Sequence, residues 1–435
     1  MKSIIISSNS SGGGKTTTTL GLIRALMKKG FDVQGYKVGP DYIDTAFQSR
    51  IAGKASRNLD LFLMGEEGVK ASYSRGEGDL GVIEGVMGLY DGKGIDSKYS
   101  TAHVGEVLNL PVVLVLSPKA QVATLCAEIE GLKNFGKVNI CGVILNNISE
   151  SYYKLLKASI EYNCGIKVFG YIPKDERLSI KSRHLGLIQS SEVEDLEEKI
   201  NLCSEYILKN VEIEELLKYF KETPKYEDNF HLDNMKIKIG VPMDKAFSFY
   251  YRENLDLLGE AGEIVYFSPL NDRELPECID FLYLGGGYPE VFLEELSENK
   301  TMLNSIKNRL NDGLGCYAEC GGLMYLTQSI DNGNMEREVV GFFSGKAVMT
   351  KSLQNFGYAS LEYEGLKINC HEFHKSCVTS SEEKVYKLTK DMYDGSRKEW
   401  NCGYEKNNTL GAYPHVHFFG NMDFLKNLLK RSYKK

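Results

Sequence analysis

Residues that could do chemistry gather in two short stretches of this 435-residue sequence. The first is YAECGGLMYL, residues 317–326, in which Cys320 follows an apolar run and precedes two glycines. A strand-to-helix turn of this kind exposes a nucleophile and leaves the next residue, Gly321, with a free backbone N–H for an oxyanion. The start of a helix also favours a thiolate. We therefore predict that Cys320 is a nucleophile and that residues 321–330 are helical.

A cysteine nucleophile needs a second oxyanion donor and a general base. The turn GGGYPE follows another apolar strand, so the backbone of Gly286 or Gly287 is the candidate donor. The segment YPHVHF offers two histidines, His415 and His417, as the base. Side chains two apart in a strand share a face, so spacing does not separate these two histidines.

A further pair of histidines lies in HEFH, residues 371–374. His371 and His374 are three apart, so on a strand they point to opposite faces. The segment also lacks the H-E-x-x-H spacing of a zinc-binding helix. We interpret it as a structural strand pair.

The second chemical stretch is SSNSSGGGKTTTTLGLIRAL, which follows a strand and opens a helix. It matches the second half of the P-loop pattern G-x-x-x-x-G-K-[ST], while Asn9 stands at the first glycine of that pattern. Asparagine tolerates left-handed backbone conformations, so we expect the turn to form. Backbone N–H groups and the helix N-terminus would then hold phosphates. The predicted ATP-binding residues of this loop are Gly12, Gly13, Gly14, Lys15, Thr16 and Thr17.

Four carboxylates follow strands of the same half. Asp41 and Asp44 lie in KVGPDYIDTAFQ, and Glu84 and Asp91 lie in VIEGVMGLYDG. Ligands of open α/β sheets collect at the carboxyl ends of the strands. We predict that Glu84 binds Mg²⁺ together with Thr16, as a P-loop threonine does. The three aspartates are candidates for substrate or metal binding.

The elements that must position these residues alternate between strands and helices over residues 1–212. The predicted strands are SIIISS, VQGYKV, GDLGVIEG, PVVLVLS, ICGVILNN and KVFGYI. Such alternation indicates βαβ units and a mainly parallel sheet. A polar, charged segment near 220–235 is typical of a linker between domains. We therefore predict an ATP-binding domain at 1–225 and a second domain at 236–435.

The second domain begins a new alternation with KIKIGVPM, GEIVYFS, IDFLYLGGG and GLGCYAE as strands. Residues 335–420 are richer in short alternating runs, which indicates an antiparallel extension of an α/β domain.

Composition limits the possible partners. The net charge of −7 argues against a nucleic-acid surface. No apolar run approaches the 18 residues of a membrane span. The ten cysteines are scattered without a C-x-x-C pair, so we expect neither a zinc site nor disulfides, and a reducing cytoplasm.

Taken in order, the motifs resemble those of the cobyrinate a,c-diamide synthases, ATP-dependent glutamine amidotransferases of corrinoid biosynthesis. The resemblance runs from residue 8 to residue 418. The motifs on which the resemblance rests are SSGGGKTTTTLGLIRAL, KVGPDYIDTAF, NLD, IEGVMGLYDG, STAHV, GVILNN, RHLGL, FSFYYRENLDLL, FSPLND, GGGYPE, AECGGLMYL, HEFH and YPHVHF.

The resemblance implies a P-loop domain similar to dethiobiotin synthetase, followed by a class I glutamine amidotransferase domain. Cys320 matches the nucleophile and His415 the base, with His417 as the alternate. Many class I glutaminases carry a carboxylate two residues after the base, where this chain has His417, so a Cys–His dyad is implied. Asn146, in GVILNN, matches an asparagine placed near the adenine.

The implied reaction amidates the c and then the a acetate of a cobyrinate-type corrinoid through an acyl phosphate. ATP, Mg²⁺ and L-glutamine are its partners, and a homodimer is compatible with the sequence. The chain departs from the family at Ser117, where relatives usually carry Asp, in TAFQ, and at Cys370 before HEFH. The first two departures fall in the ATP and substrate half.

Three rival interpretations remain. The substrate could be another tetrapyrrole, such as nickel sirohydrochlorin. The P-loop could belong to a partitioning-type ATPase switch, but those proteins carry a signature Lys where this chain has Ser10, and they have no glutaminase half. A regulatory protein with an inactive glutaminase is disfavoured by Cys320, the glycine turn and His415.

Overall fold

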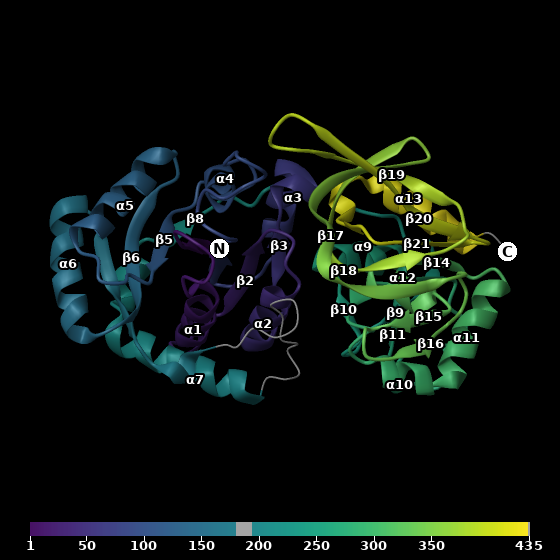
Figure 1. The fold of residues 1–435 in the computed structure, drawn as a ribbon. Helices are drawn as coiled ribbons and strands as arrows, with labels where there is room; N and C mark the ends of the chain where they lie inside the picture. Colours follow the sequence, from purple (N-terminus) through teal and green to yellow (C-terminus); the bar gives the residue numbers. More distant parts are fainter. Residues whose placement is uncertain (180–193, 434–435) are drawn as a thin grey trace. The chain divides into compact units, whose positions relative to one another are not determined.

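The computed structural model describes residues 1–179 and 194–433. The chain forms two compact units, drawn in Figure 1. The first comprises Met1–Leu61 and Val69–Asp228, and the second comprises Phe62–Gly68 and Asn229–Lys435. The predicted linker contains the junction after Asp228, whereas no sequence feature marked the short segment that joins the second unit. The predicted limits at 225 and 236 stay predictions.

The first unit is built on a parallel sheet with the strand order β3-β2-β4-β1-β5-β6-β7. All six predicted strands are present. The seven strands are β1 (Lys2–Ser7), β2 (Val33–Val38), β3 (Arg57–Leu59), β4 (Leu80–Glu84), β5 (Val112–Leu116), β6 (Ile140–Ile148) and β7 (Lys167–Pro173). A two-residue strand, β8 (Lys221–Glu222), pairs antiparallel with β1. The four central strands lie between helical layers, which explains why they are continuously apolar.

Helices cover both faces of this sheet (Figure 1). On one face, α1 (Lys15–Lys28), α2 (Ile43–Ala52) and α7 (Glu194–Asn210) share a single hydrophobic core with the alternate strand residues Ile4 and Ile6. On the other face, α4 (Thr101–Leu108) approaches Ile5 through Gly105. The remaining helical segments are α3 (Leu61–Ser74), α5 (Ala123–Phe135), α6 (Glu150–Cys164), α8 (Ile213–Leu217) and η1 (Glu176–Leu178).

The second unit has a large mixed sheet whose first part is parallel. That part contains β11 (Gly262–Phe267), β9 (Ile237–Pro242), β12 (Phe281–Leu284), β14 (Gly315–Glu319) and β21 (Thr409–Ala412). The expected extension is present and mainly antiparallel. It consists of β15 (Ser329–Asp331), β16 (Glu336–Glu338), β17 (Lys346–Tyr363), β18 (Leu366–Thr379), β19 (Lys384–Asp391), β20 (Arg397–Lys406) and β22 (His415–Val416).

A separate pair of short strands, β10 (Phe247–Phe249) and β13 (Gly286–Gly287), carries the glycine turn. The helical segments of this unit are α9 (Arg252–Ala261), α10 (Leu293–Glu298), α11 (Lys300–Asn311), α12 (Gly321–Leu326), α13 (Met422–Leu429), η4 (Phe418–Gly420) and η5 (Lys430–Tyr433).

The helix predicted at 321–330 is wrong in its length, because α12 ends at Leu326. Thr327 adopts an extended backbone, and its hydroxyl donates to the carbonyl of Met324 at 2.7 Å. This hydrogen bond satisfies one of the carbonyl groups left open at a helix end. Ile330 then lies fully buried in β15, so burial in the sheet outweighs continuation of the helix.

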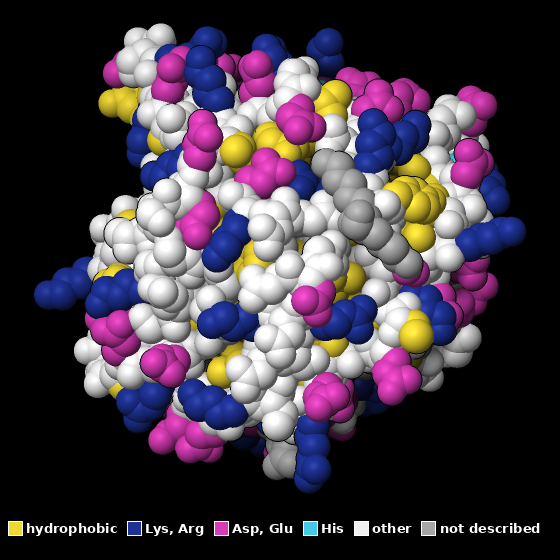
Figure 2. Space-filling model, turned by 90° about the vertical axis from the view of Figure 1, so that its right-hand side faces the viewer, with side chains coloured by type: hydrophobic (Ala, Val, Ile, Leu, Met, Phe, Trp, Pro, Cys, Tyr) yellow, Lys and Arg dark blue, Asp and Glu magenta, His cyan; other side chains and the backbone are white. Residues whose placement is uncertain are grey.

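Charged side chains of both signs are interspersed on the face shown in Figure 2, and hydrophobic side chains form small separate groups there. Among the helices of the described residues, none is both long and apolar enough to cross a bilayer. The motif RHLGL at 183–187 lies outside the described residues.

Candidate functional site

The phosphate loop connects β1 to α1. Gly12 and Gly14 have φ values of 76° and 88°, in the left-handed region that favours glycine. Asn9 does not adopt this conformation, so the expected role of its backbone is wrong. Its side chain instead donates to Glu128 at 2.6 Å and accepts from Ser8 at 3.1 Å. Side-chain hydrogen bonds therefore fix the start of the loop where a first glycine is missing.

The side chain of Lys15 folds back over the loop and donates to the carbonyl of Ser10 at 2.8 Å. Burial, and then the nearby positive charge of Lys37, lower the pKa of Lys15 to about 8. Glu84, Asp44 and Asp91 oppose this lowering by charge attraction, but they do not outweigh it. A phosphate placed on the loop would add a further negative partner for this ammonium group.

Beside the loop, Glu84 forms the centre of a buried polar cluster. Its Oε1 accepts from the hydroxyl of Thr16 at 2.7 Å and from Nζ of Lys37 at 3.0 Å, and its Oε2 accepts from Gln48 at 3.1 Å. Burial, and then the charge of Asp44, raise the pKa of Glu84 to about 7 although Lys37 and Thr16 oppose this.

Lys37 was not predicted as a site residue, although it opens the quoted segment KVGPDYIDTAF. Its Nζ lies 2.6 Å from Asp44 and 3.0 Å from Glu84, with only 4% of the side chain exposed. Burial by itself lowers the pKa of Lys37, but these two carboxylates outweigh that effect and raise it. The cluster therefore holds a permanent cation between two acidic groups at the sheet edge.

The three aspartates differ in position. Asp41 and Asp44 line the pocket next to the loop, and Asp41 also caps α2 by accepting from the backbone N–H groups of Ile43 and Asp44 at 2.8 Å. Asp91 is exposed, lies outside the residues that line this pocket, and accepts from the backbone of Gly88 at 2.8 Å. The structure thus brings two of the three predicted aspartates together.

The donor set suits Mg²⁺ that is held mainly by phosphates and water. No group of three or more acidic, histidine or cysteine side chains that could hold a metal is found among residues 1–179 and 194–433. Mg²⁺ in phosphate sites normally takes only one or two protein carboxylates. The hydroxyl of Thr16 and the carboxylate of Glu84, which already contact each other, supply oxygen ligands of the right kind.

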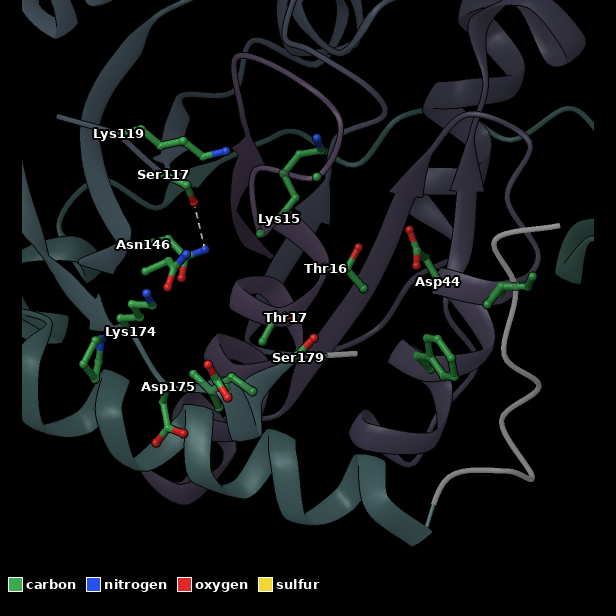
Figure 3. Close-up of a pocket in the computed structure, with 18 of the residues that line it drawn as sticks. Lys15, Thr16, Thr17, Asp44, Ser117, Lys119, Asn146, Lys174, Asp175 and Ser179 are labelled. Atoms are coloured by element: carbon green, nitrogen blue, oxygen red, sulfur yellow. Dashed lines mark hydrogen bonds between the residues drawn. The ribbon is translucent and has the colours of Figure 1, made fainter. Parts of the chain in front are cut away.

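The pocket around the loop has a volume of about 800 Å³ and is shown in Figure 3. Of the predicted ATP-binding residues, Gly12, Gly14, Lys15, Thr16, Thr17 and Asn146 line it. Gly13 does not line the pocket. Its carbonyl oxygen accepts a hydrogen bond from the side chain of Ser117. A Cβ on Gly13 would come within 2.2 Å of the hydroxyl of Ser8, so close packing requires glycine there.

In the second unit, Cys320 stands between the end of β14 and the start of α12. Its backbone has φ 49° and ψ −102°, a strained conformation for a residue that is not glycine. Cys320 is buried, with 7% of the residue exposed. Strained turns of this kind aim a nucleophile out of the end of a sheet.

His415 lies beside Cys320, at the start of β22. Burial by itself lowers the pKa of His415, but charge attraction and a hydrogen bond with Cys320, together with Glu319, raise it to about 10. His415 therefore lies within hydrogen-bonding reach of the cysteine, as a nucleophile and its base require.

A carboxylate also reaches His415, which the expected Cys–His dyad did not include. Oε2 of Glu319 lies 3.3 Å from Nδ1 of His415, and Glu319 is only 1% exposed. This carboxylate comes from the residue before the nucleophile, not from two residues after the histidine. The sequence signal available was the glutamate within AECGG, directly before the nucleophile.

His417 lies away from this group. Its Nε2 is 3.4 Å from Glu253, and its Nδ1 accepts from the backbone of Phe419 at 3.3 Å. Both ring nitrogens are thus engaged elsewhere. The geometry favours His415 as the base.

The HEFH segment contributes a neighbour that the sequence did not indicate. His371 pairs with His415 across β18 and β22, with the two rings stacked at 5.2 Å. Burial and the charge of His415 hold the pKa of His371 well below its usual value. His374 instead stacks on Tyr413 at 3.8 Å and lies 2.9 Å from Glu372. The two histidines thus contact different side chains.

The glycine turn lies against the nucleophile. A Cβ on Gly321 would be 3.0 Å from the backbone nitrogen of Gly287, and a Cβ on Gly286 would be 2.5 Å from Cε1 of His415. The absence of a side chain thus lets Gly321 approach the backbone of Gly287 and lets Gly286 approach the ring of His415. The backbone N–H groups of Gly287 and Gly321 stay the predicted oxyanion donors.

Two family models match the chain. The model described as the CobQ/CobB/MinD/ParA nucleotide binding domain matches residues 4–188, and the CobB/CobQ-like glutamine amidotransferase domain matches residues 238–422. The first match contains the phosphate loop with Thr16 and Glu84, and the second contains Cys320 and His415.

Curated relatives match over the whole chain. A cobyrinate a,c-diamide synthase of Clostridium tetani is 71% identical over 439 residues, covering 99% of this chain and 100% of the relative. The protein of that name from Clostridium acetobutylicum is 62% identical with the same coverage. That from Listeria innocua is 40% identical and covers 98% of this chain and 99% of the relative.

Proposed function

The chain belongs to the family of cobyrinate a,c-diamide synthases, and from this premise we propose that it uses ATP and L-glutamine to amidate the a and c acetate groups of a cobyrinate-type corrinoid. It is a glutamine amidotransferase with a nucleotide-binding domain. The observation that carries the proposal is that one chain holds both a phosphate loop beside a buried acidic cluster and a cysteine paired with a histidine.

In the proposed glutaminase reaction, the sulfur of Cys320 attacks the side-chain amide carbon of glutamine. Backbone N–H groups of Gly287 and Gly321 stabilise the oxyanion, and one such donor is typically worth about 3–4 kcal/mol. The imidazolium of His415 gives its proton to the departing nitrogen, which leaves as ammonia. Water, deprotonated by His415, then cleaves the thioester and releases glutamate.

In the proposed synthetase reaction, an acetate carboxylate attacks the γ-phosphorus of ATP, and ADP leaves. The product is an acyl phosphate, from which ammonia displaces phosphate to give the amide. Lys15 neutralises charge on the transferred group, and Thr16 and Glu84 would hold Mg²⁺. When bound, Mg²⁺ would neutralise negative charge on the triphosphate.

The chemistry explains why both sites are required in one chain. A carboxylate is a poor acceptor for ammonia, because the leaving group would be oxide or hydroxide. A phosphate leaves readily, so ATP activates the carboxylate and the glutaminase supplies the nucleophile. We place the corrinoid carboxylate near Asp41 and Asp44, with Asp91 as a further candidate, and the adenine near Asn146.

The reaction is proposed for a reducing cytoplasm, because Cys320 must stay a free thiol to act. All ten cysteines are free in the structure, and eight of them are buried. The oligomeric state expected at the sequence level, a homodimer, is tested by sedimentation at several protein concentrations.

Two variants test whether glutamine hydrolysis and carboxylate amidation take place at separate sites. Cys320→Ala should abolish amidation with glutamine but keep amidation with ammonia, and Lys15→Ala should lose both. The measurement is ATP-dependent conversion of cobyrinate, followed by mass spectrometry of the mono- and diamide. Loss of ammonia-dependent activity in a folded Cys320→Ala protein would contradict the proposal. If the protein converted nickel sirohydrochlorin and not cobyrinate, nickel sirohydrochlorin would replace cobyrinate as the proposed substrate.

A further inference from the structure

Three groups behind the phosphate loop form a short hydrogen-bond relay. The hydroxyl of Ser117 donates to the carbonyl oxygen of Gly13 at 3.0 Å. The same hydroxyl oxygen accepts from Nδ2 of Asn146 at 3.1 Å, as Figure 3 shows. Nδ2 of Asn146 also lies 3.5 Å from the Gly13 carbonyl. The relay therefore links the ends of β5 and β6 to the loop.

The available protons determine which group donates and which accepts in each hydrogen bond of this relay. A backbone carbonyl only accepts, and a serine hydroxyl has one proton to give. That proton goes to Gly13, so Ser117 has only an acceptor left for the side chain of Asn146. If the amide of Asn146 were reversed, Oδ1 would face the Gly13 carbonyl and compete with it for the single proton of Ser117. The relay thus holds Nδ2 toward the protein and turns Oδ1 away from it.

Close packing keeps the amide of Asn146 in this place. A Cβ on Gly14 would come within 2.0 Å of Nδ2 of Asn146, so the amide lies directly against the glycine that precedes Lys15. Within the described residues, Oδ1 of Asn146 accepts no hydrogen bond, while the residue lines the pocket. An acceptor of fixed orientation therefore faces whatever the pocket binds.

Asp44 and Asn146 lie on opposite sides of Thr16 in the pocket (Figure 3). Asp41 and Asp44 fit phosphates with Mg²⁺ and the substrate carboxylate. The side of Asn146 is also lined by the charged residues Lys119, Lys174 and Asp175. In the proposed function the adenine lies near Asn146, so the base would meet the amide of that residue.

We propose that Ser117 determines which nucleobase the pocket prefers, by fixing Asn146 with its oxygen toward the base. This rests on the proposed function, in which the pocket binds a nucleoside triphosphate. The exocyclic amino group of adenine donates to Oδ1. A 6-oxo purine, hypoxanthine or guanine, presents an oxygen instead and leaves two acceptors facing each other. Ser117 acts through Asn146 and is a positioning residue.

The test compares ATP with ITP, because the two differ at position 6 of the purine. Dissociation constants with Mg²⁺ are measured by calorimetry on the full chain. We expect the native protein to bind ATP about tenfold or more tightly than ITP, as expected for one mismatched buried hydrogen bond. Ser117→Ala should lower that ratio to about two. Ser117→Thr keeps the hydroxyl and should restore it.

Ser179→Ala is the matched control. Ser179 lines the same pocket, and its side chain makes no hydrogen bond with the described residues, so its removal should leave the ratio unchanged. An unchanged ratio in Ser117→Ala, or equal binding of ATP and ITP by the native protein, overturns the inference alone. Failure of the native protein to bind either nucleotide would overturn the proposed function as well.

Discussion

The carboxylate Oε2 of Glu319 lies 3.3 Å from Nδ1 of His415, although 96 positions separate the two residues in the chain. One residue precedes the nucleophile at the end of β14, and the other begins β22. Catalytic histidines are commonly oriented by a carboxylate on the nitrogen that does not face the nucleophile. In this chain the carboxylate and the nucleophile are consecutive residues.

Glu319→Gln should therefore slow glutamine hydrolysis strongly. The amide cannot stabilise the imidazolium by charge, so we expect kcat to fall by roughly 10²–10⁴-fold with a smaller change in KM. The pKa of His415, raised to about 10 partly by Glu319, should fall when measured by NMR titration. Ammonia-dependent amidation should stay unchanged. A folded variant with native kcat and an unshifted His415 pKa would show that Glu319 is only structural.

His415 and His417 should respond differently to replacement. His415→Asn should abolish glutamine hydrolysis, because it removes the group that moves the proton. His417→Asn removes the contact with Glu253, which is fully buried, so its main effect should be on stability, by about 1–3 kcal/mol. Steady-state kinetics and urea denaturation of both variants separate the two effects. Complete loss of turnover in a folded His417→Asn protein would favour the alternate base.

Gly286→Ala should inactivate the glutaminase by a steric effect. Its Cβ would come within 2.5 Å of Cε1 of His415, so the imidazole must move. A displacement of about 1 Å at a catalytic group costs roughly 10²-fold in rate. Gly259→Ala is the matched control, since a Cβ there would meet only Ile264 at 3.9 Å within α9. Equal glutaminase rates in the two variants would contradict this prediction.

Nucleotide binding should take up protons near pH 8. The pKa of Lys15 is lowered to about 8 by burial and by Lys37, and a bound triphosphate raises it again by charge attraction. The complex then has the higher pKa, so ATP affinity falls as the pH rises through about 8. Calorimetry at pH 8 in buffers of different ionisation enthalpy measures the uptake. A heat that does not depend on the buffer would rule out this linkage.

Lys37→Met should destabilise the first unit markedly. Removal of the ammonium leaves the buried Glu84 facing the partly buried Asp44, and loss of one partner of a buried ion pair typically costs about 3–5 kcal/mol. Lys54→Met removes an ion pair with Asp32 that is partly exposed and should cost less than about 1 kcal/mol. Thermal unfolding of both variants makes the comparison. A similar loss in both would show that the buried cluster has no special importance.

The sequence predicts most of the strands, because apolar runs between glycine, proline and polar turns have few alternatives. It also leads to Cys320 and His415 and to the phosphate loop, because each lies within a contiguous motif. Glu319 and Lys37 were harder to assign. Their roles depend on strand register and on ring and ammonium positions, which adjacent residues in the sequence do not specify.

Asn9 shows a different limit of sequence reasoning. The prediction compared it with glycine on backbone conformation, but its side chain bonds to Glu128 on a distant helix instead. The length of the helix after Cys320 was overestimated for a related reason. A continuous apolar pattern suits both a helix and a buried strand, and only the tertiary position of β15 decides between them.

The left-handed backbone of Cys320 has a consequence for the long-term fate of this site. Only glycine adopts such a conformation without strain, so Cys320→Gly should make the protein more stable while removing the nucleophile. A lineage that obtained ammonia from its surroundings would therefore gain stability by losing the cysteine. Persistence of the cysteine in any descendant would indicate continued selection for glutamine as the nitrogen source.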